Sequence, residues 1–543
     1  MILKDIIRDC GDVAASKDLP EISDLDISGV AYDSRKVKEG YLFVAIQGEK
    51  FDGHDFIEEA LKKGAIAIVH EKPINIKSFV NNHRSLKRTL GNGHSSLVRI
   101  GDQCPVTNAP LFIKVKDSRK VLACIAGNFF GRPSENLILI GITGTNGKTT
   151  TSYILKSILE AWGKSVGLIG TIQHMIKDRV FPAMHTTPES LEMQRLLSDM
   201  LSQGCSHIVS EVSSHALSQD RISGVSFCSA VFTNLTRDHL DFHKTMENYF
   251  SAKKKLFLEH LGKNGTAVIN IDDQYGKRLI SDIRAANSGT KMITTYGLES
   301  AADITAENIS NTFEGLRFKV SFRDKVCEVS STLPGMPNVY NIMSAIGASL
   351  SVGVPWQAII EGIRKADYIK GRFEKVDLGQ EFLCIVDYAH TDDALQRLIY
   401  TARNLLKSGV RSEEPPFPPG SSPRIITVFG CGGNRDPGKR PRMGAVATGL
   451  SDSVIITSDN PRNENPLDII REIELGAVNQ NYIVEPDRRE AIRTAVDMAL
   501  AGDIILVAGK GHEDYQEIKG IRHKFSDRRV LEEIIGERLK IQR

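Results

Sequence analysis

The residues with the clearest chemical meaning form a glycine-rich turn, GITGTNGKTTT, at positions 141–151. An apolar run at 137–140 precedes this turn, and a segment with helical character follows it. The order of strand, glycine-rich turn and helix is typical of a phosphate-binding loop, because backbone N–H groups and the positive helix end face an anion. Lys148 would reach the outer phosphates, and the Thr149 hydroxyl would face Mg²⁺. Ile142 replaces a glycine of the strict GxxxxGK[ST] pattern, so the loop is a variant.

Polar clusters follow other apolar runs of the same region. Glu211 comes after the run at 208–209, and His239 lies in the cluster that follows 230–232. In a parallel sheet the carboxyl ends of the strands share one edge, so we expect these clusters to converge on the phosphate-binding loop. There Glu211 and His239 could ligate a metal that bridges nucleotide phosphates. Taken singly, Glu211 could cap a helix and His239 could be a buried imidazole with its hydrogen bonds satisfied.

A second set of strand-end residues lies in the last third of the chain. Arg435 ends a Gly-Gly-Asn-Arg turn, Arg462 follows an Asp-Asn-Pro turn, and Glu513 lies in a glycine-rich turn. Guanidinium groups suit bidentate capture of a carboxylate, and a carboxylate can hold an ammonium group. One acidic and two basic groups around one crevice would suit a zwitterionic amino acid. On spacing alone, surface ion pairs around a loop are the alternative.

The elements that position these residues indicate an α/β chain of three domains. Residues 1–116 predict a small N-terminal α/β domain. Residues 117–370 predict a central ATPase domain with a parallel sheet of P-loop type, in which 303–331 form a small antiparallel appendage. Residues 371–543 repeat the alternation of strands and helices and predict a Rossmann-like, doubly wound domain. The junction near Gly371 is a candidate hinge between the last two domains.

Two stretches interrupt this pattern. Residues 79–110 predict an irregular surface insertion, and the Pro-rich stretch at 409–424 predicts a surface loop between a helix and a strand. We expect neither to carry the chemistry.

The composition narrows the class of protein. The chain has 543 residues and a formal net charge of +2, which favours neither nucleic acid nor a membrane surface as a partner. The N-terminus does not resemble a signal peptide, and no apolar run approaches the roughly 18 residues that span a bilayer. The eight cysteines lack CxxC spacing, so neither a disulfide scaffold nor a zinc site is expected. The cysteine pattern favours a reducing cytoplasm. We also expect a monomer that acts on small molecules.

Six motifs together resemble those of the Mur ligases. They are GTNGKTT at 144–150, EVSSH at 211–215, TNLTRDHLD at 233–241, GRFE at 371–374, DYAH at 387–390 and GKGHE at 509–513. The resemblance runs in register from about Asp33 to Asp527 and leaves out only the two insertions. It implies an ATP-dependent ligase of peptidoglycan precursor synthesis. Such an enzyme extends UDP-N-acetylmuramoyl-L-Ala-D-Glu at the D-glutamate γ-carboxylate, by way of an acyl phosphate.

The resemblance also implies roles for individual residues. The ATP site would comprise Gly144, Thr145, Asn146, Gly147, Lys148, Thr149, Thr150, Asn338, Arg372, Asp387 and His390. The UDP-muramoyl dipeptide would contact Tyr32, Ser34, Glu49, Lys50, Phe51, His185, Thr186, Thr187, Ser213, Gln219 and Arg221. Catalysis would depend on Lys148, Glu211, His239 and Lys253, and two Mg²⁺ ions would lie near Thr149, Glu211, His239 and Lys253.

Lys253 is a residue whose role comes from the resemblance alone. It belongs to a run of three lysines, which charge patterning by itself assigns to a solvated helix face. The matching lysine of the family is carbamylated to N6-carboxylysine, which turns a cation into an anionic oxygen ligand for a second Mg²⁺. The resemblance therefore implies this modification at Lys253.

The implied amino-acid pocket is that of the branch that uses meso-2,6-diaminopimelate. It would comprise Arg435, Asp459, Asn460, Pro461, Arg462, Gly509 and Glu513. Diaminopimelate has a second carboxylate that lysine lacks, and Arg462 provides a charge-assisted partner for it. Members of the family that add lysine lack this arginine.

Three alternatives remain at this stage. The first is the same ligation with L-lysine. The second is a ligase like folylpolyglutamate synthetase, which should lack both the N-terminal uridine-binding module and the DNPR motif. The third is a nucleotide-binding switch that hydrolyses ATP without ligation, and it would not need the C-terminal crevice.

Two positions depart from the pattern of the family. Asp392 stands where a proline usually follows Asp-Tyr-Ala-His-Thr, and Asn465 stands where the DNPR motif usually runs on to an acidic residue. Neither change removes a proposed ligand. Both could alter the stiffness of a loop or the local electric field.

Overall fold

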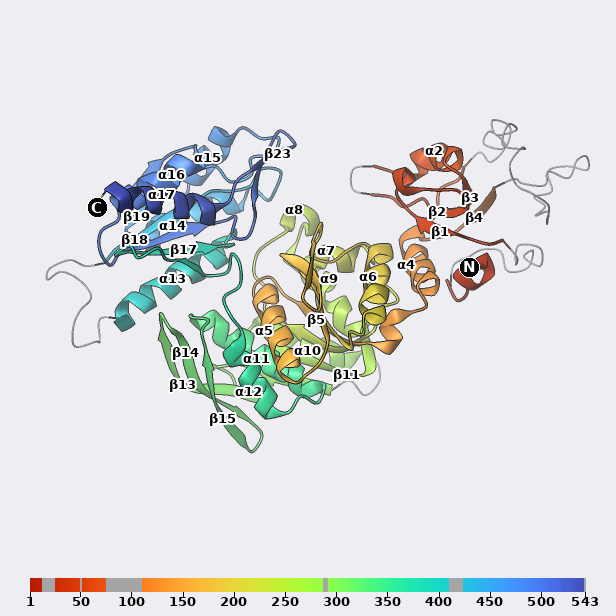
Figure 1. Ribbon diagram of the computed structural model, residues 1–543, viewed down its shortest axis with the longest axis horizontal. Helices are drawn as coiled ribbons and strands as arrows, with labels where there is room; N and C mark the ends of the chain where they lie inside the picture. Colours follow the sequence, from red (N-terminus) through yellow and green to blue (C-terminus); the bar gives the residue numbers. More distant parts are fainter. Residues whose placement is uncertain (12–24, 49–50, 75–109, 287–291, 410–422, 542–543) are drawn as a thin grey trace, which may run out of the picture.

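The computed structural model describes residues 1–11, 25–48, 51–74, 110–286, 292–409 and 423–541. Three main sheets follow one another along the chain and divide it into N-terminal, central and C-terminal units (Figure 1). This arrangement confirms the predicted α/β chain of three domains. Glu49, Lys50 and nearly all of the two predicted insertions lie outside the described residues.

The N-terminal unit is a parallel four-stranded sheet in the order β1-β2-β3-β4. Its strands are β1 (Gly29–Ala31), β2 (Tyr41–Val44), β3 (Ala65–His70) and β4 (Leu111–Lys114), and its helices are α1 (Leu3–Ile6), α2 (Ile57–Lys62) and α4 (Ser118–Phe129). Two short 3₁₀ turns, η1 (Ser34–Lys36) and η2 (Gly53–Phe56), lie between its strands. Helix α4 packs on this sheet through Val121, Leu122 and Ile125 and also contacts the central unit.

A disulfide between Cys10 and Cys124 joins the segment after α1 to α4. Cysteine spacing along the sequence cannot reveal a pair separated by 114 residues. Among the described residues, Cys205, Cys228, Cys327, Cys384 and Cys431 remain free thiols, so the bridge is not part of a disulfide scaffold.

The central unit is an eleven-stranded sheet in the order β15-β14-β13-β12-β11-β10-β5-β9-β6-β7-β8. Its strands are β5 (Ile138–Thr143), β6 (Val166–Ile169), β7 (Gln173–Ile176), β8 (Arg179–Pro182), β9 (His207–Glu211), β10 (Phe227–Phe232), β11 (Leu261–Asn270), β12 (Met292–Tyr296), β13 (Ile304–Thr312), β14 (Gly315–Phe322) and β15 (Lys325–Ser331). Strand β5 lies inside the sheet, and it pairs in parallel with β9 on one side and β10 on the other. The predicted antiparallel appendage is present as β13–β15, which extend the same sheet at one edge.

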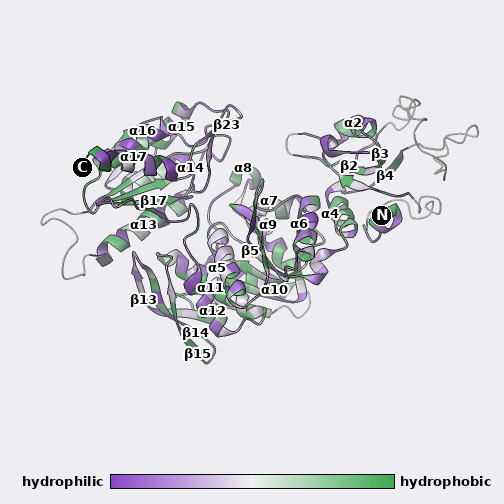
Figure 2. Ribbon diagram, viewed as in Figure 1, coloured by the Kyte–Doolittle hydropathy of each residue, from purple (hydrophilic) through white to green (hydrophobic). Residues whose placement is uncertain are grey.

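Helices cover both faces of this sheet. The central helices are α5 (Lys148–Ala161), α6 (Ser190–Ser202), α7 (Ser214–Ser218), α8 (Leu240–His243), α9 (Met246–Leu258), α10 (Gln274–Ala285), α11 (Met336–Ser351) and α12 (Trp356–Lys365). One apolar core joins the strands to α5, α11 and α12, and another joins them to α6, α9 and α10. In Figure 2 the helices carry hydrophobic and hydrophilic residues on different sides, as this two-sided covering requires. None of the described helices is long and apolar enough to cross a membrane.

The C-terminal unit is a six-stranded sheet in the order β16-β17-β21-β18-β19-β20. Its elements are β16 (Glu374–Val376), β17 (Leu383–Asp387), α13 (Asp392–Gly409), β18 (Ile425–Phe429), α14 (Lys439–Leu450), β19 (Ser453–Ile456), α15 (Pro466–Glu474), β20 (Tyr482–Val484), α16 (Arg488–Met498), β21 (Ile504–Ala508) and α17 (Asp527–Ile541), together with the hairpin β22 (Tyr515–Ile518) and β23 (Ile521–Lys524). A fully buried ion pair between Arg488 and Asp527 ties α16 to α17, and Arg488 also donates to the Ala508 carbonyl at the end of β21. This pair fixes the strand end that leads into the turn at 509–513.

Helix α5, which follows the phosphate-binding loop, packs closely on α12 at Gly362. A Cβ atom at Gly362 would lie 2.3 Å from the Ile158 Cα, and the Ser157 hydroxyl donates to the Gly362 carbonyl at 2.7 Å. The contact is backbone against backbone, so neither helix can yield by a change of rotamer. Gly362 therefore helps to set the position of α5.

We expect Gly362→Ala to lower the free energy of unfolding by about 1–3 kcal/mol, because the added methyl group overpacks the contact between α5 and α12. Gly536→Ala is the matched control, since Gly536 lies in α17, where an added Cβ atom would meet no other described part of the chain within 4 Å. This control should be neutral or stabilise the protein by about 0.5–1 kcal/mol, as Ala for Gly does inside a helix. Urea unfolding measures both changes, and equal effects at the two positions would contradict the packing argument.

Candidate active site

The loop between β5 and α5 has the geometry that an anion-binding turn needs. Gly144 and Gly147 have positive φ angles of 149° and 90°. A Cβ atom at Gly144 would lie 1.8 Å from the Thr233 Oγ1, and one at Gly147 would lie 2.4 Å from the Asn341 Oδ1. Both glycines are therefore required, by backbone conformation and by the close approach of the neighbouring segments.

The strand ends on either side of β5 converge on this loop, as predicted. The Thr149 hydroxyl donates to Glu211 Oε2 at 2.9 Å from the β9 side. From the β10 side, Thr233 Oγ1 donates to the Asn146 carbonyl at 2.6 Å, and the Asn146 N–H donates to Asn234 Oδ1 at 2.9 Å. The two neighbouring strands thus hold the loop from both sides.

Glu211 is the central acid of the candidate metal site. Its carboxylate is fully buried and accepts hydrogen bonds from the Thr149 hydroxyl and from both the N–H and the hydroxyl of Thr171. Among the described residues, no three His, Cys, Asp or Glu side chains form a group that could hold a metal by themselves. The buried carboxylate and hydroxyl oxygens nonetheless suit Mg²⁺, which takes few protein ligands and completes its shell with phosphate oxygens and water.

Lys253 lies in the interior of this site and not on a solvated face, so the expectation from charge patterning is wrong for this residue. Its ammonium group donates to the Gly144 carbonyl at 2.7 Å, and its side chain is almost fully buried. Burial lowers the pKa of Lys253 well below its usual value, and the nearby charge of Lys148 lowers it further. The pattern was misleading because Lys254 and Lys255, the next residues of the run, do remain partly exposed.

A cavity of about 260 Å³ lies between the central and C-terminal units. The predicted ATP residues that line it are Thr145, Asn146, Gly147, Lys148, Thr149, Thr150, Asn338, Arg372, Asp387 and His390. Gly144 contributes its carbonyl, which accepts from both Lys148 and Lys253. The structure therefore brings together residues from both units that the sequence separates by more than 200 positions, and Arg372 Nη2 reaches the Thr149 hydroxyl at 3.2 Å.

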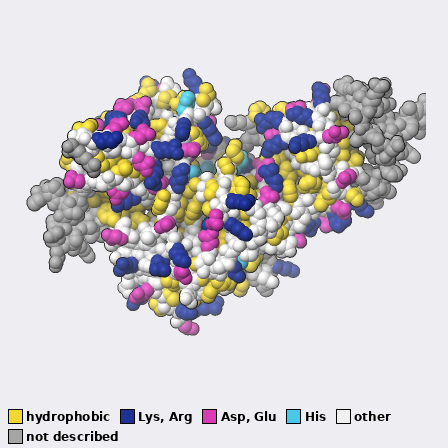
Figure 3. Space-filling model, viewed as in Figure 1, with side chains coloured by type: hydrophobic (Ala, Val, Ile, Leu, Met, Phe, Trp, Pro, Cys, Tyr) yellow, Lys and Arg dark blue, Asp and Glu magenta, His cyan; other side chains and the backbone are white. Residues whose placement is uncertain are grey.

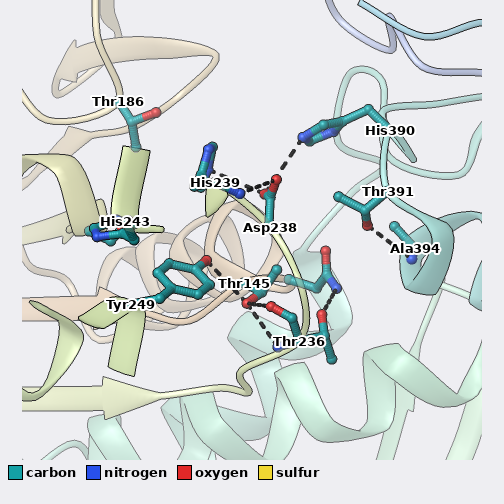
Figure 4. A network of polar contacts seen from close by, with 12 residues as sticks. Thr145, Thr186, Thr236, Asp238, His239, His243, Tyr249, His390, Thr391 and Ala394 are labelled. Atoms are coloured by element: carbon teal, nitrogen blue, oxygen red, sulfur yellow. Dashed lines mark hydrogen bonds and ion pairs between the residues drawn. The ribbon is translucent and has the colours of Figure 1, made fainter. Parts of the chain in front are cut away.

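Asp238 connects the two walls of this cavity. Figure 4 shows its carboxylate between two imidazoles, 3.2 Å from His239 Nε2 and 3.9 Å from His390 Nε2. Burial alone would raise the pKa of Asp238, but His239, His390 and Lys439 together lower it below its usual value. The acid is therefore ionised, and its negative charge lies beside the nucleotide cavity.

The residues predicted to hold the UDP-muramoyl dipeptide fall into two groups, one in the central unit and one in the N-terminal unit. Thr186 and Ser213 line the cavity, while Thr187, Gln219 and Arg221 form a hydrogen-bonded cluster beside it. His185 is exposed in the segment that leads to Thr186. Tyr32, Ser34 and Phe51 belong to the N-terminal unit and do not line the cavity; Tyr32 donates to Glu192 of α6, Ser34 donates to Glu59, and Phe51 is exposed.

The residues predicted to form the diaminopimelate crevice lie at the strand ends of the C-terminal sheet, apart from the residues that line the cavity. The Asn460 amide donates to Glu513 Oε2 at 2.8 Å, and a Cβ atom at Gly509 would lie 2.8 Å from Asp459 Oδ2. Burial raises the pKa of Glu513, and Asp459 raises it further. A cationic ligand next to Glu513 would therefore stabilise its carboxylate.

The two arginines of the crevice lie on neighbouring loops. Arg462, which has a positive φ angle of 53°, donates from Nη1 to the Gly433 carbonyl at 2.8 Å. Gly433 belongs to the glycine loop at 430–435. Arg435 ends this loop and donates to the Asn434 carbonyl. Figure 3 shows Lys and Arg side chains gathered on the sides of the N-terminal and C-terminal units that face each other, which is favourable for anionic substrates.

Comparison with known families accounts for most of the chain. Residues 26–130 match the Mur ligase family catalytic domain, residues 142–349 match the Mur ligase middle domain, and residues 371–511 match the Mur ligase glutamate ligase domain. This chain belongs to the Mur ligase family.

Two relatives and one solved structure illustrate the similarity of this Mur ligase to proteins named as 2,6-diaminopimelate ligases. This chain is 43% identical over 95% of both chains to the UDP-N-acetylmuramoyl-L-alanyl-D-glutamate--2,6-diaminopimelate ligase of Solibacter usitatus. It is 41% identical to ligase 1 of that name from Clostridium acetobutylicum, over 99% of this chain and all of the relative. A solved structure of a ligase with the same name is 32% identical, with a TM-score of 0.61, and covers 94% of this chain and 95% of its own.

The structure of this Mur ligase adds residues that sequence reasoning did not assign. Lys510 is fully buried, where its ammonium group lies 3.1 Å from Asn460 Oδ1 and 3.2 Å from Glu513 Oε2. Asp393, at the start of α13, accepts a hydrogen bond from the Asn146 amide across the cavity at 2.8 Å. Asp238 and Lys510 lie within two of the six motifs quoted above, and this location could have identified them as site residues. Asp393 gave none, because its partner lies 247 residues away.

We expect Asp393→Ala to weaken ATP binding about tenfold, because it removes a charge-assisted contact between the C-terminal unit and the phosphate-binding loop. Isothermal titration with ATP would measure this. Asp392→Ala is the matched control: Asp392 Oδ1 is buried without a hydrogen-bond partner among the described residues, so the dissociation constant should change by less than about twofold. A similar loss of ATP affinity in both variants would contradict this explanation, because it would show that any change at the start of α13 weakens binding.

Proposed function

We propose that this Mur ligase joins meso-2,6-diaminopimelate to the D-glutamate γ-carboxylate of UDP-N-acetylmuramoyl-L-Ala-D-Glu, with ATP as the energy source. The proposal rests on the cavity between the two units. The phosphate-binding loop lines one wall of this cavity, and Arg372, Asp387 and His390 line the other. The relatives that are 40–43% identical over nearly the whole chain are named as 2,6-diaminopimelate ligases, which supports this substrate over lysine.

In the first step, a γ-carboxylate oxygen of D-glutamate attacks the γ-phosphorus of ATP. The bond from the γ-phosphorus to the β–γ bridging oxygen breaks, so ADP leaves and an acyl phosphate forms. Lys148, the loop N–H groups and Arg372 would hold the transferring phosphoryl group, which is catalysis by positioning and by electrostatic stabilisation. The contacts of Arg372 and Asp393 with the loop, across the cavity, would help to keep water out of it.

In the second step, an amine nitrogen of diaminopimelate attacks the acyl carbon. The carbon–oxygen bond to phosphate breaks, phosphate leaves, and the amine gives up a proton as the amide forms. The crevice around Glu513 and Arg462 would hold the far end of the amino acid, with the ammonium group against Glu513 and the second carboxylate against Arg462. The near amine is then free to reach the acyl phosphate.

Mg²⁺ would be held by Thr149, Glu211 and His239, and it would neutralise charge on the phosphate oxygens of the nucleotide. A carbamate on Lys253 would add an anionic oxygen ligand for a second ion. The lowered pKa of Lys253 supports this proposal, because only the neutral amine reacts with CO₂. Its nitrogen lies at the Gly144 carbonyl, at the edge of the phosphate-binding loop.

The three units divide the substrates among them. Residues 1–116 would hold the uridine nucleotide, residues 117–370 ATP, and residues 371–543 the amino acid. Phe51, which is exposed at the N-terminal unit, supports the first assignment because an uncovered aromatic ring can stack on a base. The reaction uses small soluble substrates, so we place the enzyme in the cytoplasm, acting as a monomer without nucleic acid or membrane partners.

Arg462→Ala tests the choice of amino acid. We expect it to raise KM for diaminopimelate about 100-fold, because the second carboxylate loses its charged partner, and to leave ATP binding within about twofold. Release of ADP with UDP-muramoyl dipeptide and either diaminopimelate or lysine measures the discrimination. Wild-type turnover that is equal with both amino acids, or that needs neither, would overturn the proposed function.

A second measurement tests the modification of Lys253. With ¹³C-labelled bicarbonate, the wild-type enzyme should show a carbamate carbon in its NMR spectrum, and Lys253→Arg should not. Activity of the variant should fall by at least about 1000-fold, since an arginine cannot provide an anionic metal ligand. A variant that keeps normal activity would show that the reaction does not require a carbamate here.

A further inference from the structure

Arg440 of α14 has a buried guanidinium group that lies between two carboxylates. None of these three residues is among those predicted to contact a substrate. Its Nη2 atom is 2.8 Å from Glu464 Oε2, and its Nη1 atom donates to Glu472 Oε2 at 3.0 Å. Arg440 is only 2% exposed, so it needs both counter-charges to stay in place. Glu464 belongs to the loop after Arg462, whereas Glu472 belongs to α15.

Glu464 also makes a contact with the glycine loop at 430–435. Its Oε1 atom accepts a hydrogen bond from the N–H of Asn434, which has a positive φ angle of 52°. Asn434 in turn accepts from the Asn463 N–H at 3.1 Å through its side chain. Glu464 therefore ties the glycine loop to the DNPR turn and anchors both to Arg440.

This glycine loop is what holds the guanidinium of Arg462. The Gly433 carbonyl accepts from Arg462 Nη1 at 2.8 Å, and the Gly433 N–H donates to the Asn460 carbonyl at 2.9 Å. A Cβ atom at Gly433 would lie 2.0 Å from the Pro461 oxygen, so the loop and the turn are in direct contact. A shift of Asn434 would move the Gly433 carbonyl on one side and Arg435 on the other.

The opposing charge near Arg462 makes this support necessary. Glu517 of β22 lies 3.8 Å from Arg462 Nε, so it attracts the guanidinium toward the hairpin. The Gly433 carbonyl holds the other edge of the same group. A glycine loop free to move would let Arg462 turn toward Glu517 and away from a ligand carboxylate.

We propose that Glu464, anchored by Arg440, is a positioning residue that sets the place of Arg462 and Arg435 for the carboxylate groups of the incoming amino acid. The proposal rests on the proposed function, since it assigns Glu464 to the diaminopimelate crevice. It predicts that loss of Glu464 weakens recognition of diaminopimelate while the nucleotide cavity stays unchanged.

The matched pair Glu464→Ala and Glu472→Ala tests this proposal, because both remove one carboxylate from the same arginine and the first also releases Asn434. We expect Glu464→Ala to raise KM for diaminopimelate about tenfold and Glu472→Ala to raise it less than about twofold, with KM for ATP unchanged in both. Glu464→Gln keeps an oxygen that can accept from Asn434 N–H, so its KM should rise only about threefold. Thermal unfolding of all three variants reports on their folding.

Three results would overturn the proposal. Equal increases of KM for diaminopimelate in Glu464→Ala and Glu472→Ala would assign the effect to Arg440 alone. No increase in either variant would show that Glu464 does not position Arg462 and Arg435. A fall of kcat with unchanged KM values would indicate only a loss of folded enzyme. Should Glu464→Ala not fold, Glu464→Gln against Glu472→Gln makes the comparison with a smaller expected difference, about threefold against less than about twofold. The wild-type enzyme in the same assay tests the proposed function separately, since a lack of turnover with diaminopimelate would count against that function and not against Glu464.

Discussion

Two amines meet at one carbonyl oxygen, and the active site depends on this contact. Lys148 and Lys253 donate to the Gly144 carbonyl at 2.9 and 2.7 Å, from different helices and in a buried place. Burial lowers the pKa of both lysines; Glu211 and Asp238 offset part of this at Lys148, and Asp238 offsets part of it at Lys253. Lys148 and the N–H groups of the loop therefore favour phosphate groups at this place.

The sheet makes this contact possible. Strand β5 delivers the loop at its carboxyl end, and its parallel neighbours β9 and β10 end at the same edge with Glu211 and Thr233. Gly144 and Gly147 leave no room for side chains, so the loop can lie directly against these strand ends. The C-terminal sheet repeats the principle with different residues, and its strand ends hold Asn460 and Glu513 in place of phosphate-binding groups.

Sequence reasoning found the parts of the site that are local in the chain. The phosphate-binding loop, the convergence of strand ends and the three-unit α/β fold all follow from short patterns of glycine, apolar and polar residues. Patterns of charge failed at Lys253, because burial of one lysine among three depends on which helix face meets the sheet. The partners Asp393–Asn146 and Cys10–Cys124 are 247 and 114 residues apart, so only the assembled fold reveals them. The residues expected at the dipeptide and amino-acid sites remain predictions in their ligand roles.

The junction between the last two units contacts both the cavity wall and the turn that carries Glu513. A Cβ atom at Gly371 would lie 2.1 Å from the backbone nitrogen of His512, so the junction packs directly on the turn that carries Glu513. Arg372, the next residue, covers the Tyr388 ring at 4.8 Å and reaches the Thr149 hydroxyl of the loop. The cavity wall at Arg372 therefore packs directly against the turn at 509–513. Arg372, which reaches the phosphate-binding loop, and the turn that carries Glu513 are therefore held in place by the same packing contact at Gly371.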